Sequence, residues 1–314
     1  MIISASRRTD IPAFYAEWFI NRIREGYCTV PNPFNAKQVS RISLSPRDVD
    51  MIVFWTRFAR PLLTHLDELD QRGFHYYFLY TLMNNPRQLD PKSPCHEKSI
   101  ETFCRLAERV GKEKVLWRYD PIVFTSLTNL DFHTETFQRI AEQLNGYTRK
   151  CIISFVDIYR KATGRLRVLE KKGVKVVEPA EEEINRLMHH IADAGAANGM
   201  EVRSCAEEQG DCSQVVLPGK CIDDGLIRNV FGLDVTTRKD PSQRTACGCA
   251  ASRDIGMYDT CRFGCVYCYA TASFDRAKER YRDHDRNSPS LTGRFEATVS
   301  KKRKSKQRSL FDKG

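Results

Sequence analysis

Five of the twelve cysteines lie within twenty-two residues near the end of the chain, between Cys247 and Cys268. The last three, Cys261, Cys265 and Cys268, follow the spacing C-x3-C-x2-C. This spacing lets three thiolates from one loop converge on a metal centre, where they would ligate three irons of a [4Fe–4S] cluster and leave the fourth iron open. Zinc is the competing interpretation, because C-x2-C pairs commonly contribute to tetrahedral zinc sites.

The cysteines upstream of this loop suffice for a second metal centre. They fall in a turn-rich segment with little apolar periodicity, and a long irregular segment needs a staple such as metal ligation to hold it. We expect an auxiliary iron–sulfur cluster here, with a structural zinc as the alternative. The predicted ligands are Cys205, Cys221, Cys247 and Cys249, with Cys212 in reserve.

The composition and the first residues of the chain predict a location in the reducing cytoplasm. Hydrophobic residues make up 41% and charged residues 29% of the chain, and no apolar run is long enough to span a bilayer. The first ten residues lack the basic and apolar regions of a secretory signal. We therefore expect a cytoplasmic protein without membrane association, in which clustered cysteines bind metal rather than form disulfides.

The positive charge of the chain is concentrated at its end. Residues 276–314 contain thirteen Lys/Arg and five Asp/Glu, which is most of the net charge of +10. The run at 301–308 is typical of a disordered, solvated end, and it would also permit weak nucleic-acid association.

Strand patterns alternate with helix patterns through the first two hundred residues. The predicted strands cover residues 1–5, 49–56, 74–82, 115–119, 151–156 and 201–205. The predicted helices start near residue 12 and cover 60–72, 99–110, 133–145, 181–197 and 269–282. This alternation predicts an α/β fold with a parallel sheet, because parallel strands need crossover connections. Six units fit either an open doubly wound sheet or a partial barrel.

Polar residues cluster where the strands end, which is the functional edge of parallel sheets. Ser6, Arg7 and Asp10 follow the first strand, and Arg118 and Asp120 lie near the end of the fourth. The last two share a strand face, so an internal ion pair is as plausible as a ligand contact. We find no glycine-rich phosphate loop and no nucleophile elbow, which argues against nucleotide hydrolysis and esterase chemistry.

The aromatic Tyr267 directly before Cys268 makes the loop C-x3-C-x-Tyr-C, which resembles the signature of the radical S-adenosylmethionine (SAM) superfamily. The whole chain is similar to an uncharacterised bacterial family, a domain of unknown function whose C-terminal cysteine cluster is similar to the radical SAM cluster. The matching segments are residues 4–12, 118–122, 219–223 and 243–270. The segment 118–122 also resembles the spore photoproduct lyase branch of that superfamily.

The resemblance implies a partial parallel (β/α) barrel of the TIM type. In it, Cys261, Cys265 and Cys268 would hold a [4Fe–4S] cluster whose open iron binds SAM, and reduction would yield a 5′-deoxyadenosyl radical that abstracts hydrogen from substrate. Because this loop normally follows the first barrel strand, the resemblance also implies a circular permutation with residues 1–5 as the second strand. The predicted cofactor-binding residues are Ser6, Arg7, Asp10, Arg118 and Asp120.

The expected organisation is a barrel core at 1–205, a cysteine-rich cluster-binding module at 206–285 and a basic disordered tail at 286–314. The expected function is that of a radical SAM-type enzyme that receives electrons from a donor such as a flavodoxin or ferredoxin. The sequence assigns no substrate and no catalytic residue. The alternative is a zinc-stapled nucleic-acid-binding protein, whose binding would fall with salt and with removal of residues 300–314.

Overall fold

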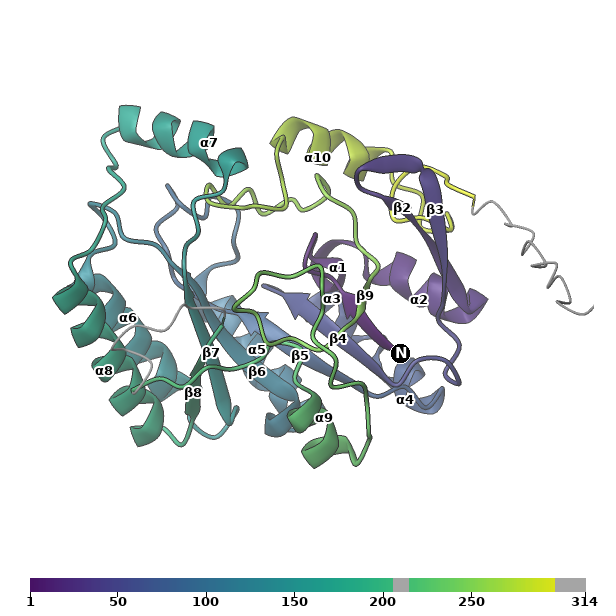
Figure 1. Ribbon diagram of the computed structural model, residues 1–314, viewed down its shortest axis with the longest axis horizontal. Helices are drawn as coiled ribbons and strands as arrows, with labels where there is room; N and C mark the ends of the chain where they lie inside the picture. The colour runs from purple at the N-terminus through teal and green to yellow at the C-terminus, as the bar shows by residue number, and fades with distance from the viewer. Residues whose placement is uncertain (206–214, 297–314) are drawn as a thin grey trace, which may run out of the picture.

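A seven-stranded parallel sheet forms the centre of the computed structural model, which describes residues 1–205 and 215–296 (Figure 1). Its strands are β1 (Ile2–Ala5), β4 (Met51–Thr56), β5 (Tyr76–Thr81), β6 (Val115–Ile122), β7 (Lys150–Phe155), β8 (Glu201–Ser204) and β9 (Arg253–Asp254). The first six confirm the predicted strands. Sequence patterns did not predict β9, because two residues are too short to show a period.

The strand order separates the two predicted sheet architectures. It runs β8-β7-β6-β5-β4-β1-β9, so strands β1 and β4 to β8 neighbour one another in chain order without a reversal. A doubly wound sheet reverses its order at a switch point, and that alternative is therefore wrong. Within the described residues β8 and β9 are the two edges, so the sheet is not closed into a barrel.

The last strand of the chain lies beside the first. Strand β9 pairs in parallel with β1, with Arg253 opposite Ile3 and Asp254 opposite Ser4. Read from β9, the sheet order becomes continuous from one edge to the other. Residues 1–5 thus hold the second position in the sheet.

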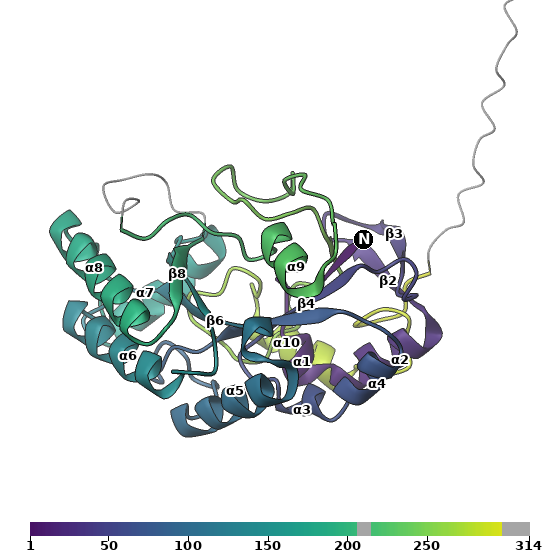
Figure 2. The ribbon, with the colours of Figure 1, turned by 90° about the horizontal axis from the view of Figure 1, so that it is seen from below.

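The helices mainly cover one face of the sheet. They are α1 (Ile11–Phe14), α2 (Ala16–Glu25), α3 (Arg60–Leu63), α4 (Leu66–Gln71), α5 (His96–Val110), α6 (Leu130–Gln143), α7 (Arg160–Lys171), α8 (Glu181–Ala197), α9 (Asp224–Phe231) and α10 (Phe274–Arg282), with a short 3-10 helix at Lys112–Lys114. Figure 2 shows α2 to α6 and α8 on one side of the sheet and α9 on the other. Helices α7 and α9 were not predicted.

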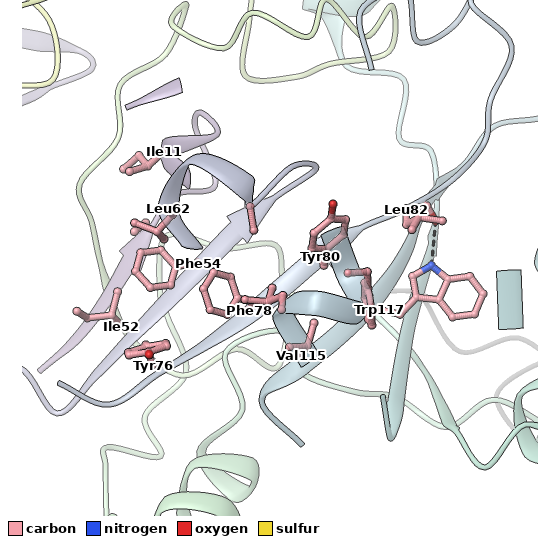
Figure 3. Close-up of a cluster of buried hydrophobic side chains, with 14 of the residues drawn as sticks. Ile11, Ile52, Phe54, Leu62, Tyr76, Phe78, Tyr80, Leu82, Val115 and Trp117 are labelled. Atoms are coloured by element: carbon pink, nitrogen blue, oxygen red, sulfur yellow. Dashed lines mark hydrogen bonds between the residues drawn. The ribbon is translucent and has the colours of Figure 1, made fainter. Parts of the chain in front are cut away.

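The helix-covered face is built from alternate strand residues, because successive side chains of a strand point to opposite faces. Figure 3 shows this cluster, in which Phe54 and Phe78 stack with ring centroids 4.9 Å apart. The indole of Trp117 donates a hydrogen bond of 2.9 Å to the carbonyl of Leu82, so this buried donor is satisfied. The same alternation leaves a second apolar set for the opposite face.

That opposite face is covered by residues 215–252, including α9. The sheet contributes buried Met51, Val53 and Tyr77, and Ile222 and Ile227 pack against them from the segment. The four cysteines of the predicted second centre are buried in this same cluster. Residues 215–252 therefore cover this face with α9 and irregular chain, and the edge strand β9 follows directly after them.

The prediction that the tail begins at residue 286 is wrong for residues 286–296. The indole of Trp18 donates a hydrogen bond of 2.9 Å to the carbonyl of Ser288. The amide of Thr29 donates one of 2.8 Å to the carbonyl of Pro289. Thr29 belongs to an unpredicted antiparallel hairpin of β2 (Tyr27–Asn32) and β3 (Asn35–Ser43). Charge pattern does not reveal such backbone contacts. The basic run 301–308 lies outside the described residues.

The membrane prediction concerns helix length and hydropathy. No helix in the described parts of the chain is both long and apolar enough to cross a bilayer.

Candidate metal centres

The loop that carries Cys261, Cys265 and Cys268, called the loop trio below, is anchored by the aromatic residue of the motif. The buried hydroxyl of Tyr267 accepts a hydrogen bond of 2.7 Å from Arg57, which directly follows β4, and donates to Asp90 at 2.8 Å. Arg57 and Asp90 form an ion pair of 3.1 Å with each other. The carboxyl edge of the sheet therefore holds the loop through a closed polar network.

Helix α7 fixes the same loop from another side. The guanidinium of Arg165 donates to the carbonyls of Val266 at 2.8 Å and Thr271 at 2.6 Å, and it also donates to the carbonyl of Cys268. One side chain thus satisfies three backbone acceptors around the end of the loop. Such bonds restrict the directions in which the three thiols can point.

The loop trio occupies an apolar environment without contact between its sulfurs. Cys265 is buried and the other two are partly buried, packed with Phe263 and Val123. Burial, with the neighbouring Cys268, raises the pKa of Cys261 to about 12. No hydrogen bond joins the three thiols to one another, although all three positions are described. The thiols are close enough to interact electrostatically but do not touch.

The second predicted set, Cys205, Cys221, Cys247 and Cys249, converges on one place and is called the cysteine tetrad below. The sulfurs of Cys205 and Cys221 are 3.4 Å apart. Cys247 and Cys249 lie in the same buried cluster, and each thiol influences the pKa of its neighbours in the set. Cys212 lies outside the described residues.

The four thiols of the tetrad differ in their pKa. Hydrogen bonds from Cys221 and Cys247 lower the pKa of Cys249, with Arg7 contributing, and its sulfur also accepts the amide of Ile222 at 3.3 Å. In residues 1–205 and 215–296, no group of three or more His, Cys, Asp or Glu side chains has, as it stands, the arrangement of a metal site. Rotation of the thiols would therefore accompany metal binding at either set.

Two arginines and a tryptophan lie beside the tetrad. The guanidinium carbons of Arg7 and Arg118 lie 5.0 and 4.8 Å from the ring centroid of Trp55. Arg118 pairs with Asp120, so the internal ion pair, one of the two alternatives for these residues, is present. Within the described chain, Arg7 Nη2, Arg118 Nε and Trp55 Nε1 are buried without a hydrogen-bond partner. Because an orphaned buried donor is costly, these groups mark a place where an acceptor on a ligand would be stabilised.

Two predicted cofactor-binding residues are already engaged by the protein. The hydroxyl of Ser6 donates to Asp254 at 2.7 Å, which ties the end of β1 to β9. The carboxylate of Asp10 accepts from the hydroxyl of Thr56 at 2.8 Å and the amide of Arg57 at 2.6 Å. Burial raises the pKa of Asp10 to about 7. Both side chains position neighbouring segments, whereas Arg7 and Arg118 keep free donors.

Sequence analysis missed several residues that hold the site, namely Trp55, Asp90, Arg165 and Asp254. The carboxylate of Asp254 accepts from Ser4 at 2.8 Å and from the amide of Arg7 at 2.8 Å, so it fixes the strand from which the cysteine loop departs. No local pattern marks these residues. Their partners are distant in sequence, and only the position of Trp55 at a strand end was a usable signal.

A cavity of about 270 Å³ adjoins the Tyr267 network. Its lining is mostly polar and includes Arg57, Asn84, Asn85 and Asp90. A larger cavity of about 320 Å³ lies at the amino ends of β6 to β8, lined by residues such as Lys112 and Lys150. The cavity that shares Arg57 and Asp90 with the Tyr267 network is the one at the carboxyl edge, where parallel sheets place their ligands.

Residues 2–270 match the model of the domain of unknown function DUF1848. The chain belongs to this family. The matched range includes both cysteine sets and confirms the expected relation to a domain of unknown function. No curated protein matches the chain. A solved structure from Bacteroides thetaiotaomicron VPI-5482, provisionally described as an alpha-L-fucosidase, is similar at 10% identity over 76% of this chain and 85% of that chain, with a TM-score of 0.26.

Proposed function

We propose that this DUF1848 chain is a radical SAM-type iron–sulfur enzyme on a partial, TIM-like β/α barrel. The observation that carries the proposal is the position of the C-x3-C-x-Tyr-C loop in the fold. The loop follows β9 at the edge of the sheet, and β1 is the next strand in spatial order. With α10 after the loop, the succession is strand, cysteine loop, helix and second strand, as expected for a permuted member of that superfamily.

The donor set of the loop trio fits a [4Fe–4S] cluster. Cysteine ligands of such a cluster bind separate irons, so their sulfurs lie apart rather than in contact. The three thiols belong to one apolar cluster and make no hydrogen bonds among themselves in this described loop. When bound, a cluster of this type supplies the electron that cleaves SAM to methionine and a 5′-deoxyadenosyl radical.

The protein's own residues would orient the bound molecules. Tyr267 and Arg165 hold the loop, and the apolar surroundings of Cys265 keep water from it. The free N–H groups of Arg7 and Arg118 would bind a carboxylate of the cofactor or substrate. We propose an electron donor such as a flavodoxin or ferredoxin, and we assign no substrate.

Anaerobic reconstitution of the full chain tests this function. We expect the wild type to bind about four iron and four sulfide ions at the loop trio and to form 5′-deoxyadenosine from SAM under reductant. Cys265→Ala should lose both properties. Cys104→Ala, an isolated cysteine on α5, is the matched control and should keep both. A colourless wild-type protein without SAM cleavage would show the proposal to be wrong.

A further inference from the structure

The cysteine tetrad joins the two ends of the segment that covers the second face of the sheet. Cys205 directly follows β8 at one edge, and Cys221 precedes α9. Cys247 and Cys249 precede β9 at the other edge. Figure 2 shows α9 on the side of the sheet opposite the main helix layer. Four side chains from distant points of an irregular segment thus meet in a single buried cluster.

The sulfur spacing distinguishes one metal ion from a cluster. A Zn–S bond of about 2.3 Å places the sulfurs of a tetrahedral site about 3.8 Å apart. The observed 3.4 Å between Cys205 and Cys221 is close to this value, and Cys247 and Cys249 are buried in the same cluster. A cubic cluster would hold four thiolates on four separate irons, farther apart than touching thiols.

The charges beside the tetrad suit a site with an excess of thiolate. One divalent ion with four thiolates carries a net charge of −2, which is costly to bury unless it is compensated. Arg7 interacts with Cys249, and Arg118 interacts with Cys221 and Cys205. Each arginine also faces a carboxylate, Asp240 at 3.7 Å from Arg7 and Asp120 beside Arg118, so the compensation is shared.

We propose that Cys205, Cys221, Cys247 and Cys249 form a mononuclear, tetrahedral zinc site that fixes residues 215–252 on the sheet. Binding forms four Zn–S bonds and releases the four thiol protons to solvent, without any change of oxidation state. The sulfurs of Cys205 and Cys221 would separate by about 0.4 Å to reach the tetrahedral spacing. This site rests on its own geometry and does not require the loop trio to carry a cluster.

Metal analysis of the full chain and its variants tests the site. Wild-type protein should contain about one zinc per chain. Cys221→Ala should lose the zinc, whereas Cys265→Ala and the control Cys104→Ala should retain it. If the loop trio binds no iron–sulfur cluster, the wild type and Cys265→Ala should have the same low iron content. The zinc content of both proteins should still be about one per chain.

Cobalt substitution of the wild-type chain keeps the test decisive if Cys221→Ala does not fold. Cobalt in the tetrad should give the intense sulfur-to-metal charge-transfer and visible bands of a tetrahedral tetrathiolate site. Iron and sulfide near eight per chain without zinc would overturn the proposal in favour of a second cluster. Wild-type protein without zinc and without the cobalt bands, or with a Cys205–Cys221 disulfide in its mass spectrum, would also overturn it.

Discussion

A single phenol hydroxyl explains why an aromatic residue stands directly before the last cysteine of the loop. Tyr267 contributes its ring to the apolar cluster around Cys265 and its hydroxyl to the pair formed by Arg57 and Asp90. The side chain therefore joins the cysteine loop to the segments that follow β4 and β5. A phenylalanine would preserve the packing but not this connection.

We expect Tyr267→Phe to lower the free energy of unfolding by about 1–3 kcal/mol, because buried partners lose a hydrogen bond. Tyr269→Phe is the matched control in the same loop. Its hydroxyl makes one bond, of 2.7 Å to the carbonyl of Arg7, and its side chain is 41% exposed. Anaerobic urea unfolding measures both variants. Equal losses would contradict the role given to the Tyr267 network.

At the scale of elements, a buried histidine joins α6 to β6. The hydroxyl of Tyr119 lies 2.8 Å from Nδ1 of His133, and Nε2 of the same ring lies 3.1 Å from the carbonyl of Val123. This pattern fits a neutral ring that accepts from the phenol and donates to the carbonyl. Burial lowers the pKa of His133 to about 4.

This arrangement predicts a pH dependence of stability. Between pH 6.5 and about 4 the unfolded chain binds a proton at His133 that the folded chain does not. Stability should therefore fall as pH falls through this window, by about 1.4 kcal/mol per pH unit from this group, and be fully present above it. His133→Gln should reduce the slope in urea unfolding, whereas His189→Gln on exposed α8 surface should not. Identical slopes would refute the prediction.

At the scale of the whole molecule, the folded unit extends past the matched range of the family. Residues up to 296 are held by backbone contacts with α2 and β2, including those of Ser288 and Pro289. Most of the positive charge lies in 276–314. The segment 286–296 is therefore part of the folded protein, and seven of the thirteen Lys/Arg of 276–314 follow it in the sequence.

Two truncations should separate these parts. Removal of 297–314 should leave the metal content and the urea midpoint unchanged, and it should abolish weak nucleic-acid binding. In the full chain, the affinity for nucleic acid should fall when the salt concentration rises from about 50 to about 200 mM. Removal of 286–314 should also lower the urea midpoint, because Trp18 and Thr29 lose their partners. Nucleic-acid binding that survives the first truncation would exclude the tail as its source.

The sequence alone determined the features that depend on near neighbours. Strand and helix periods predicted six of the seven sheet strands, and the short spacing of Cys261, Cys265 and Cys268 placed three thiols on one loop. Counting the cysteines of the irregular segment narrowed the second centre to five candidates, with the tetrad preferred and Cys212 in reserve. These features are local in the chain or follow from the number of available ligands, so residue type and spacing suffice to predict them.

The tertiary structure decided the features that depend on distant contacts. The pairing of β9 with β1 joins residues some 250 positions apart, and it fixes where the cysteine loop leaves the sheet. The stack of Arg7 and Arg118 on Trp55 comes from three different strands or strand ends. The 3.4 Å between Cys205 and Cys221 brings two cysteines from separate segments into contact, and the proposed zinc site starts from this contact. The sequence shows which cysteines are available as metal ligands, but the distances between them are set only when the sheet brings separate segments together.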